Sequence, residues 1–148
     1  MLFRSQGFPP DSISTDLHIT SMNSGMKDML NVMDKFLAMG MSLDDVIAKS
    51  TWNPAKEIHH EELGNLSVGS PADVTVLRVV NGKFGFTDMY GARLDGKQRL
   101  ECELTLRDGK VVYDLNGITR PEWTTLPKGY TRTGDAAWDA ITPAARKR

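Results

Sequence analysis

Residues 50–77 read STWNPAKEIHHEELGNLSVGSPADVTVL and mark the point where the pattern of the chain changes. Helical spacing of apolar residues precedes this stretch, and the alternation typical of strands follows it. Asn53 before Pro54 predicts a helix over residues 54–59, with Asn53 as its N-cap and Pro54 as its first residue. Val-rich residues 72–77 predict a strand, because they carry one charge only, Asp73, near the start.

Two helices are predicted upstream. Over residues 26–39 the apolar side chains recur at spacings of three and four, which makes one continuous stripe suited to packing on a sheet. The stripe consists of Met26, Met29, Leu30, Met33, Phe36 and Leu37. Gly40 ends this helix, and Ser42 opens the next, with Asp45 as its capping partner. Residues 12–15 predict a brief strand, and residues 20–25 a polar loop.

The downstream pattern has a period of two. Leu100, Cys102, Leu104 and Leu106 share one face of a predicted strand over residues 100–107. Asp108-Gly109 predicts a tight hairpin turn, and residues 110–114 return antiparallel. Phe84, Phe86 and Tyr90 suggest an additional strand and turn. Proline and glycine break every run after Gly117, which predicts a surface tail with Trp123 and Trp138 packed on the body.

Composition restricts the class of protein. Eighteen Lys and Arg residues nearly balance nineteen Asp and Glu residues, which disfavours a nucleic-acid or anionic-membrane partner. Cys102 is the single cysteine, so an internal disulfide is excluded and we expect a cytoplasmic location. It lies on the apolar side of a strand and is interpreted as core filler. No apolar stretch approaches the roughly 20 residues that span a bilayer.

The spaced set Thr51-x-Asn53-Pro54-Ala55, Gly64-x-Leu66-x-Val68-Gly69-x-x-Ala72-Asp73-Val74-x-Val76-Leu77 resembles the metal-dependent amidohydrolases. In that superfamily such a segment leaves the catalytic barrel and re-enters a small β-sandwich. Residues 14–18 (STDLH) and 104–113 (LTLRDGKVVY) extend the resemblance, which is greatest to the dihydroorotase-like deacetylases.

The resemblance implies an α/β fold, the C-terminal piece of a (β/α)8 barrel followed by antiparallel strands of the β-sandwich. Residues 1–60 would be the last βα unit of the barrel and the helices after it, 61–118 the sandwich strands, and 119–148 a surface tail. A complete barrel typically takes about 250 residues, which exceeds this chain.

Asp16 is the principal candidate for catalysis and metal binding. A carboxylate just beyond a strand end occupies the position where parallel α/β barrels place catalytic groups. In the amidohydrolases that the stretch resembles, the aspartate ending the last barrel strand ligates a divalent metal and accepts the proton of the attacking water. The alternative is that Asp16 caps a turn.

The resemblance also implies two substrate-binding residues. His18 matches the histidines that help hold the substrate carboxylate in dihydroorotase-like enzymes, although a loop histidine without that duty is the alternative. Asn23 lies in the loop expected over the site. His59 and His60 are interpreted as surface residues, because adjacent residues on a helix point about 100° apart.

The implied activity is hydrolysis of an amide or ester bond in a small acylated acid, with a divalent metal, zinc, in the complete enzyme. The His-x-His pair, the bridging carboxylate and the further histidines of the family have no counterpart here. We therefore expect this chain alone to hold no metal and to be inactive, and to form homo-oligomers or require an N-terminal half. A non-catalytic α+β module that binds a partner is the alternative function.

Overall fold

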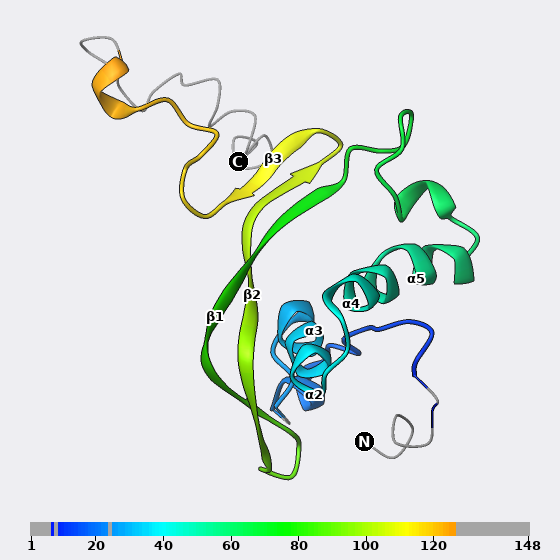
Figure 1. Ribbon diagram of the computed structural model, residues 1–148. Helices are drawn as coiled ribbons and strands as arrows, with labels where there is room; N and C mark the ends of the chain where they lie inside the picture. Colours follow the sequence, from blue (N-terminus) through cyan, green and yellow to red (C-terminus); the bar gives the residue numbers. More distant parts are fainter. Residues whose placement is uncertain (1–6, 8, 24, 127–148) are drawn as a thin grey trace. The chain divides into compact units, whose positions relative to one another are not determined.

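The computed structural model describes residues 7, 9–23 and 25–126 (Figure 1). The described chain forms two compact units. The first contains the described residues up to Pro71 together with Leu77–Glu101, and the second contains Ala72–Val76 and the described chain from Cys102. The three strands form one sheet in the order β1-β2-β3. A chain of helices followed by a small sheet agrees with the mixed α and β content predicted from the sequence.

The first unit begins with two helices. Helix α2 spans Ile19–Asn23, so the predicted loop over residues 20–25 is partly helical. Helix α3 spans Met29–Ala38. It starts later than predicted because the Asp28 carboxylate accepts the Asn31 backbone N–H at 2.7 Å and fixes the N-cap there. Gly40 follows the helix with φ +86°, the left-handed conformation that favours glycine.

Helix α4 spans Leu43–Ser50 and confirms the predicted cap. The Ser42 hydroxyl accepts the Asp45 backbone N–H at 3.1 Å. Helix α5 spans Trp52–Glu57, and the predicted N-cap at Asn53 is wrong, because Thr51 occupies that position. The Asn53 side chain instead donates to the Asp11 backbone oxygen at 2.8 Å. A 3-10 turn, η1, follows at Glu61–Leu63.

Strands β1 (Val74–Thr87) and β2 (Arg93–Arg107) are longer than the sequence predicted. Phe84 and Phe86 lie in a strand and Tyr90 in the turn after it, as predicted, but the strand is the end of β1 and not an additional one. The turn between the strands is closed by the Asp88 N–H, which donates to the Ala92 oxygen at 3.0 Å.

The core of the first unit joins α3, α4 and the hairpin. Met33, Val46 and Leu100 are buried at its centre. Part-buried apolar side chains surround them, including Met29, Leu30, Phe36, Leu37, Met41, Ile47, Leu77 and Val79. The predicted stripe of α3 therefore packs against strand residues, as expected for an amphipathic helix.

Residues 12–15 do not form the predicted strand. The segment is extended and is held by single contacts: the Ile13 N–H donates to the Lys49 oxygen at 2.8 Å, and the Ile13 side chain is buried. A strand this short requires neighbouring strands, and among the described residues no strand pairs with it.

The second unit contains the end of β2 and strand β3 (Lys110–Asp114), paired antiparallel. Asp108 and Gly109 both have positive φ, +49° and +71°, which confirms the predicted two-residue turn. A bulge interrupts the register between Thr105 and Leu106.

The remainder of the second unit differs from the sequence prediction at Trp123. This residue lies in a 3-10 turn, η2 (Trp123–Thr125), with 77% of its surface exposed, so it is not packed on the body. The predicted packing of Trp138 lies outside the described residues.

Candidate functional site

The segment that leads to Asp16 is anchored on two helices. Besides the Ile13 contact to α4, the Ser12 hydroxyl donates to a Glu57 carboxylate oxygen at 2.9 Å, and Asn53 of α5 holds the Asp11 carbonyl. These contacts fix where the chain arrives at the loop. The position of Asp16 is therefore set by α4 and α5.

Asp16 adopts a left-handed backbone conformation with φ +44°. Aspartate enters this region more readily than most non-glycine residues, because its short polar side chain finds local hydrogen bonds. The side chain is 87% exposed. A carboxylate presented in this way is free to contact a ligand, and the turn at Asp16 directs the chain into α2.

His18 lies beside Asp16 and caps α2. Its ring Nδ1 accepts the Thr20 backbone N–H at 3.3 Å, and its Nε2 lies 3.7 Å from a carboxylate oxygen of Asp16. The structure thus brings together two of the three side chains predicted from the sequence. Asn23 is exposed at the last position of α2, and its role in substrate binding stays a prediction.

The far end of the loop is held at Gly25. The Lys35 ammonium group donates to the Gly25 oxygen at 2.9 Å, and burial lowers the pKa of Lys35. Gly25 has φ +92°, and an added Cβ would lie 2.9 Å from the Asp88 backbone oxygen. Only glycine fits this position without strain. Asp16 and Gly25, which flank α2, are therefore both held in place by contacts within the first unit.

The remaining histidines lie apart from the site. His59 has φ +58°, and the His60 Nδ1 lies 2.8 Å from a Glu62 carboxylate oxygen. The hydrogen bond to His60 lowers the pKa of Glu62. Both histidines are exposed, which confirms their interpretation as surface residues.

The described residues do not by themselves fit a metal ion. Within residues 7, 9–23 and 25–126, no group of three His, Cys, Asp or Glu side chains is arranged to hold one. Asp16 offers one carboxylate, whereas a catalytic zinc typically takes three protein ligands. The chain can contribute a ligand to a metal centre, and the other ligands would have to come from elsewhere.

Sequence reasoning missed Asp34, the buried carboxylate of α3. Its side chain accepts the Leu100 backbone N–H at 2.8 Å, and the residue is 5% exposed. Burial raises the pKa of this carboxyl group. The signal was present, since Asp34 lies four residues after Leu30 and three before Leu37, on the apolar stripe. Its location in the core assigns it to structure and not to the site.

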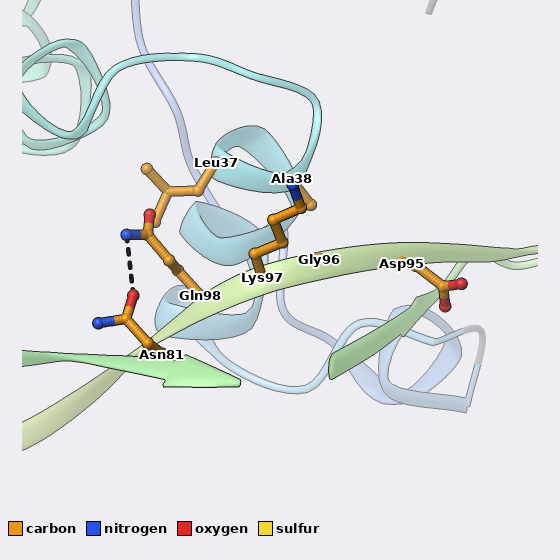
Figure 2. A pocket seen from close by; sticks show the side chains of 7 residues that line it. All are labelled: Leu37, Ala38, Asn81, Asp95, Gly96, Lys97 and Gln98. Atoms are coloured by element: carbon orange, nitrogen blue, oxygen red, sulfur yellow. Dashed lines mark hydrogen bonds between the residues drawn. The ribbon is translucent and has the colours of Figure 1, made fainter. Parts of the chain in front are cut away.

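An open pocket of about 430 Å³ lies between the C-terminal end of α3 and the two long strands (Figure 2). Its lining is Leu37, Ala38, Asn81, Asp95, Gly96, Lys97 and Gln98. The Gln98 amide donates to the Asn81 side-chain oxygen at 3.2 Å, as Figure 2 shows. None of the predicted site residues lines this pocket, so it is a separate feature of the first unit.

The fold resembles solved enzyme structures. A crystal structure of an adenine deaminase matches 76% of this chain with a TM-score of 0.71 and 28% sequence identity, and the match covers 30% of that enzyme. A dihydroorotase structure matches 74% of the chain with a TM-score of 0.65 and 34% identity, again over 30% of its length. The fold of this chain is therefore shared with about a third of each of these two enzymes.

The amidohydrolase family matches residues 4–112, a range that includes Asp16, His18 and Asn23. A deacetylase of Brucella anthropi is 41% identical over 86 residues, which are 58% of this chain and 21% of the deacetylase. The chain belongs to the amidohydrolase family. It spans about a fifth of the length of this curated relative. Within the described residues, no helix is long and apolar enough to cross a membrane.

Proposed function

We propose that this chain is part of a metal-dependent amidohydrolase that hydrolyses an amide or ester bond of a small acylated acid. Residues 1–60 would supply the terminal βα unit and helices of the barrel, 61–118 strands of the sandwich, and 119–148 a surface tail. The juxtaposition of Asp16 and His18 carries the proposal. The similarity to deacetylases supports the choice of an acylated substrate.

Asp16 is the general base in this proposal. Its carboxylate follows the anchored segment at residues 11–13 and is 87% exposed. It would accept a proton from the attacking water and return it to the leaving nitrogen or oxygen. In the complete enzyme a divalent metal, which we propose to be zinc, would make water more acidic and polarise the scissile carbonyl. Asp16 would be one of its ligands.

His18 and Asn23 would bind the acid group of the substrate. With Nδ1 occupied by the Thr20 N–H, a neutral His18 ring carries its proton on Nε2. That N–H faces the same side as the Asp16 carboxylate and can donate to a substrate carboxylate. Asn23 at the end of α2 would add a side-chain amide donor. We also propose that the protein is located in the cytoplasm and that the isolated chain is inactive.

The test is a chimera in which this chain replaces the matching segment of the Brucella anthropi deacetylase. We expect hydrolysis of N-acetylated amino acids, and a loss of kcat of roughly 10²- to 10⁴-fold in Asp16→Asn, the range typical of a general base. Asp11→Asn is the matched control, because the contact of Asp11 to Asn53 uses its backbone oxygen. An active Asp16→Asn chimera would refute the assignment.

A second candidate is a non-catalytic module that binds a partner or a separately encoded N-terminal half. Exposed apolar side chains favour it, among them Ile19 at 82% and Leu66 at 78% exposure. The nucleotide sequence upstream of this chain separates the two candidates. A reading frame encoding a His-x-His pair after an apolar strand argues for a split or frameshifted enzyme. Near-stoichiometric zinc on this chain alone argues against the ligand count given above.

A further inference from the structure

One hydroxyl group lies at the centre of the loop that presents Asp16 and His18. The Ser21 Oγ donates to the Asp16 backbone oxygen at 2.8 Å and accepts the His18 backbone N–H at 2.9 Å. The His18 oxygen, 3.0 Å away, is a second acceptor for the same proton. A serine hydroxyl has one proton and two lone pairs, so these partners use most of its capacity.

The contact to the Asp16 carbonyl bears on the conformation of Asp16. A left-handed φ of +44° is unfavourable for a residue with a Cβ. The Thr15 hydroxyl, which accepts the Leu17 N–H at 3.2 Å, tightens the same turn from the other side. The Ser21 hydroxyl thus restrains the Asp16 carbonyl and, through it, the direction in which the chain leaves Asp16 toward His18.

The contact to His18 completes a reciprocal cap on α2. The His18 ring accepts a hydrogen bond from the Thr20 backbone N–H. The hydroxyl of Ser21, three residues after His18, accepts one from the His18 backbone N–H. The bond from the His18 N–H to the Ser21 hydroxyl is the half of a capping box that the third helical residue supplies, whereas the His18 ring accepts the N–H of the second helical residue, Thr20. The Thr20 N–H holds the His18 ring, and the Ser21 hydroxyl holds the His18 backbone from which that ring projects.

We propose that Ser21 is the positioning residue of the site. Its hydroxyl holds the left-handed turn at Asp16 and the capped ring of His18, so that a carboxylate and an imidazole N–H face one carboxylate-bearing ligand together. This assignment rests on the proposed function, in which Asp16 is the general base and His18 binds the substrate. The geometry itself can be tested without catalysis.

The experiment is NMR of the 148-residue chain and of two variants, Ser21→Ala and Ser21→Thr. In Ser21→Ala we expect the His18 and Thr20 amides to exchange with water roughly two- to tenfold faster, the change that loss of one net hydrogen bond produces. The order parameters of the Asp16 and Leu17 amides should fall as well. Ser21→Thr keeps a hydroxyl and should restore both. Ser12→Ala is the control, since its hydroxyl contacts Glu57.

Three results would overturn the proposal. Unchanged His18 and Thr20 exchange in Ser21→Ala would show that the hydroxyl holds nothing. Failure of Ser21→Thr to restore the wild-type values would assign the effect to side-chain size. Faster exchange at the buried Val46 in Ser21→Ala would show that Ser21 supports the whole unit instead of the loop. An inactive chimera with intact NMR behaviour would refute the proposed function and leave the positioning role standing.

Discussion

The hydrogen bond between Asp34 and Leu100 gives the sharpest test of how the first unit is held together. Removing the acceptor in Asp34→Ala leaves the Leu100 N–H buried without a partner, since Leu100 is 4% exposed. Asp34→Asn keeps a side-chain oxygen for that N–H. Both variants are uncharged, so the charge of Asp34 does not contribute to the difference between them, which reports the hydrogen bond together with the volume of the amide group. We expect Asp34→Ala to be less stable than Asp34→Asn by about 1–3 kcal/mol.

Urea unfolding followed by far-ultraviolet circular dichroism measures this difference. With a typical slope of about 2 kcal/mol/M, the two midpoints should differ by roughly 0.5–1.5 M. Asp95→Ala is the control, because the Asp95 carboxylate is exposed and paired with Arg93 on the surface. Equal midpoints for Asp34→Ala and Asp34→Asn would refute the reasoning.

The pH dependence of the same pair has a definite sign. Burial raises the pKa of folded Asp34 above its ordinary value of 3.8, so the folded state binds this proton more tightly than the unfolded state does. The wild type therefore gains stability from Asp34 as pH falls through the raised pKa toward 3.8. Asp34→Asn lacks this gain, so its stability relative to the wild type should be highest at neutral pH and should decline as pH falls.

Other carboxyl groups act in the opposite direction but cancel in this comparison. The pKa of Glu101 is lowered by hydrogen bonds to Arg78 and Arg99, and that of Asp114 by hydrogen bonds from Thr119. Their contributions to stability are lost as pH falls through the lowered values. Because both groups are present in the wild type and in Asp34→Asn, a constant stability difference from neutral pH to about 4 would contradict the assignment of the raised pKa to Asp34.

Three further changes test the elements around the site. Asp28→Ala removes the N-cap of α3 and should cost about 1 kcal/mol in urea unfolding, with Asp28→Asn close to the wild type. Val46→Ala removes two methyl groups from a fully buried side chain and should lower the free energy of unfolding by about 2–3 kcal/mol in the same measurement. A urea midpoint equal to that of the wild type would contradict this expectation. Gly109→Ala places a Cβ at φ +71° in the hairpin turn and should cost about 1 kcal/mol, seen as faster amide exchange in β3, whereas Asp108→Asn should be tolerated.

Local chemistry explains which elements the sequence could predict. The cap formed by Ser42 and Asp45 and the turn at Asp108-Gly109 involve neighbours in the chain, and both are confirmed. Asn53 is different, because its amide found the distant Asp11 carbonyl, a partner that no local pattern reveals. The strand predicted at residues 12–15 failed for the same reason, since strands depend on neighbours outside the segment.

The candidate site was predicted only in part. Asp16 and His18 were identified through a family resemblance, and the structure places them side by side. The role of Ser21 was not predicted, although its spacing of three from His18 is that of a capping pair. Histidine is an unusual N-cap, so the spacing of His18 and Ser21 does not predict a cap from the sequence alone. The positive φ of Asp16 likewise becomes visible only in the folded loop.

The order β1-β2-β3 means that each outer strand pairs on one side only within the described chain. In general, an edge strand presents backbone N–H and C=O groups with which another extended chain can pair. We expect two copies of this polypeptide to associate through these edge strands at high concentration. Additional strands of a longer polypeptide would extend the sheet at the same edges. Pairing there would stabilise both the edge strand and the strand that is added.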